Sequence, residues 1–345
     1  MERRREASLQ AMLRRVGNSR AAGGWLALLM LAGAAWGQSC STGEDFEAPA
    51  RAGLEAAAHK YFALAAKGDV AGLKESAIPS VAEAFSGIAG AVQENQAAFA
   101  KASSTVKAIY LLTTEGSAPL DRAEFLCGVF GKSGQTASSS VFVLNGLQPG
   151  RYGVAILDVT GDDGRYAVSF VLQDVTGEWR LGGYYVKPTL AAGHDSGWFA
   201  DQARGFAAKG QKHNAWFYFL QARNLATLVP FLSTRETDRL YDEMQKVASA
   251  DAPEGFPVEL AGVGRTYKIK SMFAYGVAGE VNLVVKYEAA DVSDTVKTFT
   301  ENQSVVRALV GKWPELRDGF GAIVARATEA SGRDFGTLVQ MKELK

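Results

Sequence analysis

Hydrophobic residues recur at helical spacing in the segment that follows residue 45. Pro49 lies in the first turn of a predicted helix, and Gly68 ends it. Asp69 can cap a short helix that runs to about residue 77. Ser80-Val81-Ala82-Glu83 has the form of a capping box, which predicts the start of a longer third helix.

From residue 106 the hydrophobic period changes to that of strands. Six strands are predicted, and the turns that separate them contain glycine: 106–113, 122–130, 139–145, 151–159, 166–174 and 178–186. Short turns favour antiparallel neighbours. The strand at 151–159 is apolar on both faces, so we expect a sheet that is covered on both sides or strongly curled. Helices followed by these strands predict an α+β domain over residues 46–188.

Residues 189–250 are predicted to form a helical hairpin rich in aromatic residues. Its small and aromatic residues have the spacing of one tetratricopeptide repeat, and a single repeat cannot bury its own apolar face. The hairpin is therefore expected either to bridge neighbouring domains or to bind an extended peptide. The candidate side chains are those of His194, Trp198, Trp216 and Tyr218.

The remaining residues, 251–345, are predicted to form a small ββαββ domain. Apolar residues alternate on a hairpin between Tyr267 and Tyr287. A helix capped by Thr300 with Gln303 is expected next, and strands at 322–327 and 335–341 close the domain.

The first 37 residues have the order of a secretory signal peptide. Arginines are concentrated in residues 1–20, and an apolar run follows at 21–36. This run is shorter than the roughly 20 residues that a membrane-spanning helix needs. Cleavage after Gly37 would leave an exported protein, periplasmic or extracellular, with a flexible tail at 38–45. Three points stay open: translation starting at Met12, an uncleaved anchor at 21–36, and lipidation of Cys40.

The charge and cysteine content exclude several classes of site. There are 37 basic and 37 acidic residues with no basic run in the body of the chain, so no nucleic-acid partner is expected. Two cysteines and three histidines are too few for a zinc ribbon or an iron–sulfur cluster, and no metal or cofactor is predicted. After export, Cys40 and Cys127 either form a disulfide or remain a free tail thiol and a buried strand residue.

Two resemblances add to this picture. The order of Tyr61-Phe62-Ala63-Leu64, Gly68-Asp69 and a closing strand from Gly177 to Val186 resembles the nuclear-transport-factor-2-like superfamily. That resemblance implies a curled sheet around helices and transfers no catalytic residue. The whole chain also resembles a family of secreted bacterial proteins with no assigned function, through the following segments: Cys127-Gly128-Val129, Tyr185-Val186-Lys187-Pro188, Ala192-Gly193-His194-Asp195, Phe231-Leu232-Ser233 and the 267–287 hairpin.

Enzymes of that superfamily place an acid or base inside the cone of the sheet. Here Asp158 shares a strand face with Tyr152 and lies near Tyr166 of the next strand, an arrangement suited to proton transfer if the face is apolar. The alternative is that Asp158 is a solvated strand end.

Three other motifs have simpler explanations. Gly131-Lys132-Ser133 ends like a phosphate-binding loop, but the first glycine of that motif is missing and a hairpin turn is expected. Asp162-Asp163-Gly164 is also expected to be a hairpin turn and not a calcium loop. His194-Asp195 lacks a nucleophile elbow, so a hydrogen-bonding loop is favoured over catalysis.

The sequence as a whole predicts an exported multidomain protein that is not an enzyme. It is expected to bind an unidentified small molecule or peptide, or to have a structural role. The alternative is an isomerase, dehydratase or hydrolase with its site in the cone.

Overall fold

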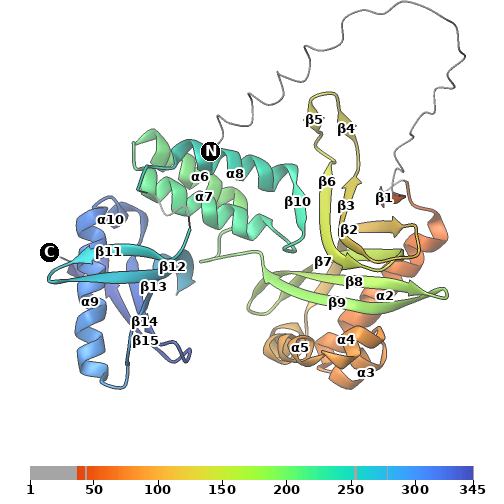
Figure 1. Cartoon of the computed structure of the whole chain (residues 1–345), viewed down its shortest axis with the longest axis horizontal. Helices are drawn as coiled ribbons and strands as arrows, with labels where there is room; N and C mark the ends of the chain where they lie inside the picture. The colour runs from red at the N-terminus through yellow and green to blue at the C-terminus, as the bar shows by residue number, and fades with distance from the viewer. Residues whose placement is uncertain (1–36, 43–44, 252–254, 278, 345) are drawn as a thin grey trace, which may run out of the picture. The chain divides into compact units, whose positions relative to one another are not determined.

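The computed structural model describes residues 37–42, 45–251, 255–277 and 279–344. The chain is an α+β protein (Figure 1). The expectations for the leader and anchor at 1–36, and for a start at Met12, lie outside the described residues. Among those residues, no helix combines the length and the apolar character that crossing a membrane requires.

Helices precede the main run of strands, as the sequence predicts, although the short strand β1 lies ahead of them. Their bounds are α2 (Ala48–Lys67), α3 (Val70–Glu75), α4 (Pro79–Glu83) and α5 (Ser86–Phe99). Gly68 ends α2 with a φ of 71°, a left-handed conformation that glycine adopts at little cost. The Asp69 carboxylate caps α3 by accepting a hydrogen bond from the Gly72 amide at 2.9 Å. Both local signals are confirmed.

The capping box at Ser80 is wrong. Pro79 begins the short helix α4, so Ser80 lies inside its first turn and not ahead of it. Ala84 then leaves the helical conformation, and α5 begins separately at Ser86.

A five-stranded antiparallel sheet follows, with the order β1-β2-β7-β8-β9. Its strands are β1 (Gln38–Thr42), β2 (Ser103–Thr114), β7 (Gly150–Gly161), β8 (Gly164–Val175) and β9 (Glu178–Pro188). Residues 38–42 were expected to be part of a tail, yet they pair with Tyr110–Thr114 of β2. Backbone pairing with an existing strand explains how this polar segment becomes ordered.

A separate sheet has the order β10-β6-β3. It consists of β3 (Leu120–Cys127), β6 (Ser140–Leu147) and β10 (Leu232–Thr234). Beyond it, β4 (Phe130–Gly131) and β5 (Gly134–Gln135) form a hairpin whose turn contains Lys132-Ser133. The predicted strands therefore divide between two sheets, because β2 pairs with β7 while β3 pairs with β6.

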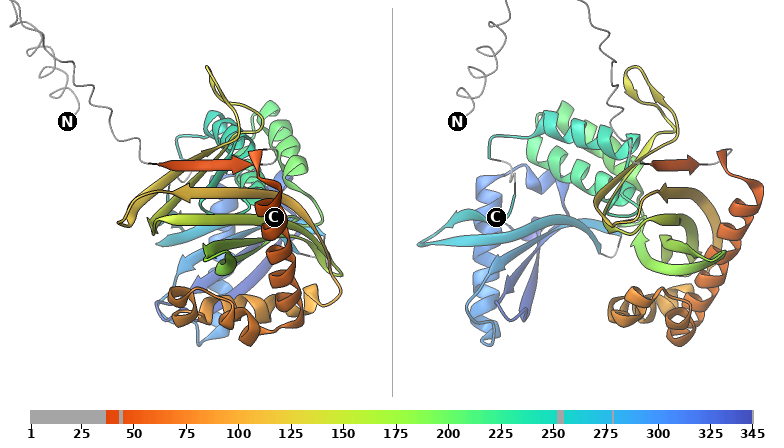
Figure 2. Two further views of the ribbon diagram at one scale, coloured as in Figure 1. Left: turned by 90° about the vertical axis from the view of Figure 1, so that its right-hand side faces the viewer. Right: turned by 45° about the vertical axis from the view of Figure 1, so that its right-hand side comes forward.

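The five-stranded sheet is packed on both faces (Figure 2). On the face toward α2 and α5, Phe62, Phe99 and Phe170 are buried. On the opposite face, Val154 and Ile156 pack with residues of β3 and β6. This two-sided packing accounts for the strand at 151–159 that is apolar on both faces.

The helical hairpin and the C-terminal sheet share a third core. The helices are α6 (Ser196–Ala208), α7 (Lys212–Ala226) and α8 (Arg235–Val247). The sheet contains β11 (Val258–Gly262), β12 (Arg265–Val277), β13 (Glu280–Glu288), β14 (Ala322–Thr328) and β15 (Asp334–Gln340), in that order. Between β13 and β14 lie α9 (Thr295–Lys312) and α10 (Leu316–Gly319).

Two expectations for this C-terminal part need correction. Three strands precede α9, since β11 adds an edge strand to the predicted ββαββ order. The cap of α9 is Asp294, whose carboxylate accepts from the Lys297 amide at 3.0 Å, and not Thr300. Thr300 lies within the helix, where its hydroxyl donates to the Val296 carbonyl.

Candidate functional site

Asp158 and Tyr152 lie on the same face of β7, as the alternation predicts, but in different environments. Tyr152 is buried, its hydroxyl donates to the Gln148 carbonyl at 2.8 Å, and burial raises its pKa. Asp158 is at the exposed end of the strand, where Lys107 Nζ lies 2.9 Å from its carboxylate. The carboxylate is therefore in a partly solvated ion pair and not in an apolar cavity.

Tyr166 lies on the other face of the sheet. It is opposite Val159 across the β7–β8 ladder, and its ring packs edge-on against Phe99 with 5.3 Å between centroids. Burial and the neighbouring Asp163 raise its pKa. The three residues thus do not converge inside a hollow cone, and buried side chains fill the helix-facing side of the sheet.

An open groove of about 740 Å³ lies where the ends of β2, β7 and β8 approach the first residues of α6 and α8. Asp158 and Tyr166 both line this groove, although they come from opposite faces of the sheet. Tyr110 and Arg165 add further polar groups, and Gly197 lines the side formed by α6. We refer to this surface as the groove.

The two helices at the groove have well-defined starts. Asp195 caps α6 by accepting from the Trp198 amide at 3.0 Å, and Thr234 caps α8 by accepting from the Thr237 amide at 3.3 Å. Asp195 thus acts as a cap and makes no hydrogen bond or ion pair with His194. The His194 ring instead stacks on Trp198, with 3.7 Å between ring centroids.

Direct contacts join the strands on one side of the groove to the helical segment on the other side. Strand β10 pairs with β6, and Phe231 packs against Phe142 and Tyr185. Lys187 of β9 donates to the Asn224 side chain of α7 at 3.0 Å, and partial burial lowers the pKa of this lysine. The groove is therefore bounded by elements that contact one another directly.

The aromatic residues of α7 belong to the core shared with the C-terminal sheet. Trp216, Phe217 and Tyr218 are all buried there, whereas Trp198 of α6 is only partly buried. The Tyr218 hydroxyl donates to the Gly319 carbonyl at 2.5 Å, and burial raises the pKa of Tyr218 to about 12. These contacts give Tyr218 a packing role.

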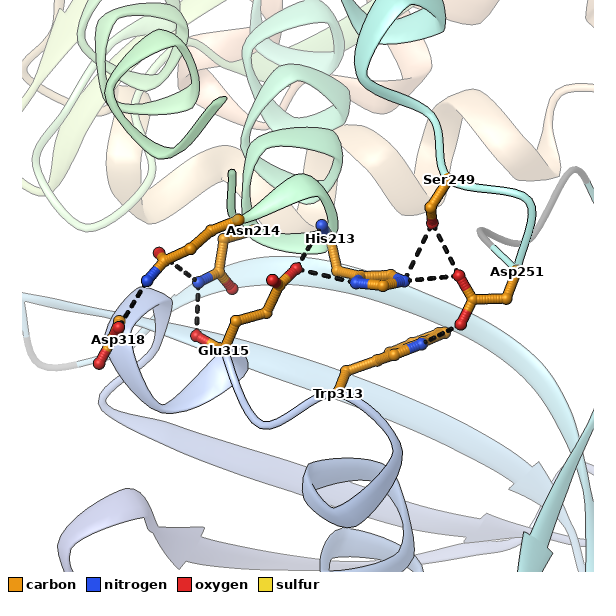
Figure 3. Close-up of polar contacts among 8 residues, drawn as sticks. His213, Asn214, Ser249, Asp251, Trp313, Glu315 and Asp318 are labelled. Carbon is orange, nitrogen blue, oxygen red and sulfur yellow. Dashed lines mark hydrogen bonds and ion pairs between the residues drawn. The ribbon is translucent and has the colours of Figure 1, made fainter. Parts of the chain in front are cut away.

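A polar cluster around His213 was not predicted (Figure 3). His213 Nδ1 lies 2.8 Å from Glu315 Oε1, and Nε2 lies 2.9 Å from Asp251 Oδ1. The Ser249 hydroxyl is 3.0 Å from the same Nε2 and 2.8 Å from Asp251. The Trp313 indole donates to Asp251 Oδ2 at 2.7 Å. The sequence offers no motif for this cluster, because its residues come from three separate segments.

The order Ser249, His213, Glu315 is that of a nucleophile, a base and an orienting acid. However, Asp251 faces the nitrogen that would have to accept the serine proton. Only an imidazolium can donate to Glu315 and Asp251 at the same time. The hydrogen bond from the Trp313 indole, followed in importance by the one from His213, holds the pKa of Asp251 far below its usual range. The cluster therefore forms a hydrogen-bonded clamp between α7, the segment at 249–251 and α9–α10.

Within the ranges that the structure describes, no group of three or more histidine, cysteine, aspartate or glutamate side chains is arranged to hold a metal ion. No family model, curated protein or solved structure matches the chain, so its function has to be inferred from its own geometry.

Proposed function

We propose that this protein is an exported, non-catalytic binding protein whose ligand lies in the groove. The observation that supports this most directly is the open groove of about 740 Å³, in which Asp158, the carboxylate considered as an acid or base, is already paired with Lys107. Concave surfaces of this size are typical of ligand sites.

The charges of the groove suggest the kind of ligand. Lys107, Arg165 and Arg235 are matched by three carboxylates, those of Asp158, Asp195 and Glu236. With the charges balanced, neither an anion nor a cation is favoured as a whole. The tyrosines offer ring faces and hydroxyl groups, so we infer a polar ligand without net charge, either a small molecule or a short peptide.

Export is supported by two features of the chain. The arginine-rich segment and apolar run before Gln38 have the order of a cleavable leader. The two cysteines of the sequence form a disulfide, a bond that persists mainly in oxidising compartments. Periplasmic and extracellular locations both fit this proposal.

A cone-site enzyme remains the rival function. It would use Asp158 as acid or base, with Tyr166 as hydrogen-bond donor. The ion pair with Lys107 weighs against this role, because a base must be free to take a proton from a substrate.

A groove-filling substitution tests the proposal. Gly197→Trp places an indole in the groove, and Gly205→Trp is the matched control, because Gly205 lies on the same helix with open space beyond it. Wild-type protein should be stabilised by a neutral tetrasaccharide or a capped tetrapeptide, measured as a rise in melting temperature. Gly205→Trp should retain that rise and Gly197→Trp should lose it. Equal responses of the two variants would contradict a groove site.

A further inference from the structure

A second concave surface lies on the C-terminal part, away from the groove. It has a volume of about 560 Å³ and is formed by α9, α10, β15 and the residues that follow β15. Gln303, Arg307, Val310 and Gly311 line it from α9, since positions i, i+4, i+7 and i+8 share one helix face. We refer to it as the C-terminal pocket.

Part of the lining of the C-terminal pocket is apolar. Val310 and Val339 are both buried side chains, and Pro314 and Leu344 complete this part. Such a lining favours a ligand with an aliphatic portion, because covering it removes apolar surface from water.

Two arginines, Arg307 and Arg317, line the same pocket. Across the described ranges of the chain, neither has a carboxylate within ion-pair distance, whereas Arg204, Arg265 and Arg326 each have at least one. Glu343 also lines the pocket and is exposed. Among the described lining residues, two cations against one carboxylate leave one excess positive charge.

The hairpin explains why Arg317 has no acidic partner among the residues that the structure describes. Arg317 lies between Glu315 and Asp318 in the sequence, but both of these carboxylates are used on the hairpin side (Figure 3). Glu315 contacts His213, and Asp318 accepts from Gln211 Nε2 at 2.6 Å.

Backbone carbonyls position the Arg317 guanidinium. Its Nη1 donates to the Leu344 carbonyl at 2.7 Å and, at 3.5 Å, to the Met341 carbonyl. Carbonyl groups orient the guanidinium without neutralising its charge. Its remaining N–H groups are free to donate hydrogen bonds to an oxyanion.

We propose that the C-terminal pocket binds a small amphiphilic anion, an aliphatic chain that ends in a carboxylate or a phosphate. Arg307 and Arg317 bind the oxyanion, and Val310, Val339 and Leu344 cover the chain. Arginine suits both head groups, because its planar guanidinium donates paired hydrogen bonds to either.

Calorimetric titration of the full chain with octanoate tests the proposal, with acetate and 1-octanol as probes that lack the chain or the charge. Octanoate should bind at least about tenfold more tightly than either probe. Octyl phosphate should compete with it. The ratio of the two affinities tells which head group is preferred, and both rankings are consistent with the site.

Arg307→Gln should weaken octanoate binding by about tenfold or more. Arg122→Gln, which changes an exposed arginine of β3, should leave it unchanged. Arg317→Gln is less suitable, since it also removes the hydrogen bonds to the last turn. Gly197→Trp should not affect octanoate binding, which separates this site from the groove.

Three results would overturn the proposal. They are no octanoate binding up to about 1 mM, 1-octanol binding as tightly as octanoate, and an Arg307→Gln variant with wild-type affinity for octanoate.

Discussion

Cys40 and Cys127 form a disulfide between edge strands of two different sheets. Cys40 lies on β1 and Cys127 on β3, with 5.1 Å between their Cα atoms and a separation of 87 positions in the sequence. Beside it, the Glu124 amide donates to the Gln38 side chain at 2.8 Å. The disulfide therefore links the start of the described chain covalently to the sheet that also contains β10.

Removal of this disulfide should destabilise the first domain substantially. For a closed loop of this length the chain-entropy model gives about 4 to 5 kcal/mol. The double variant Cys40→Ser, Cys127→Ser should unfold at a lower denaturant concentration than oxidised wild type. Reduced wild type should unfold at the same concentration as the variant. If thiol labelling without reductant modifies both cysteines of exported protein, the disulfide does not form there.

Truncation of Trp216 should cost stability and not binding. Its side chain is 8% exposed within the core shared by the hairpin and the C-terminal sheet, so Trp216→Ala should lower the free energy of unfolding by about 3 to 5 kcal/mol. Phe299→Ala, at a 45% exposed position on α9, should change it by less than about 1 kcal/mol. Unchanged stability together with loss of binding to an extended peptide would instead support a recognition role for the hairpin.

The hydroxyl of Tyr218 should contribute measurably to stability. Tyr218→Phe leaves the Gly319 carbonyl without this donor and should cost about 1 to 3 kcal/mol in chemical denaturation. Tyr241→Phe is the control, because Tyr241 is exposed. Equal stabilities of the two variants would show that the Tyr218 hydrogen bond makes no net contribution to the free energy of unfolding.

The clamp around His213 should make stability sensitive to acid. The pKa of Asp251 is lowered in the folded protein, so the stabilisation from its ionised form is present above the ordinary aspartate pKa of about 3.9 and is lost as pH falls below it. Wild type should therefore be more stable than Asp251→Asn at pH 7, and the difference should shrink between about pH 4 and pH 2. Asp242→Asn, an exposed site on α8, should show no such convergence. A wild-type advantage as large at pH 2 as at pH 7 would exclude this origin.

Local signals in the sequence predicted much of the fold. The α2 boundaries at Pro49 and Gly68, the Asp69 cap and the turn at Asp162-Asp163 depend on residues close together in the chain, and all are found. Strands β1, β10 and β11 were missed. Each is a short strand at the edge of its sheet, and a short edge strand gains its order mainly from the strand beside it.

The candidate sites were harder to predict for the same reason. The strand period correctly placed Asp158 on the face of Tyr152. It carries no information on how deeply the Asp158 carboxylate is buried or on its ion pair with Lys107, which is 51 residues away. The His213 clamp joins residues up to 102 positions apart. Contacts of this kind follow from the packing of whole elements, which no local pattern contains.

Native mass spectrometry of the protein exported by its own host tests the central claim most directly. Wild type and Gly205→Trp should retain a ligand that Gly197→Trp lacks, and the ligand mass should stay unchanged during incubation with the protein. Conversion of that ligand to a product, slowed by Asp158→Asn, would contradict a non-catalytic groove. A ligand retained equally by Gly197→Trp would contradict the groove as its site.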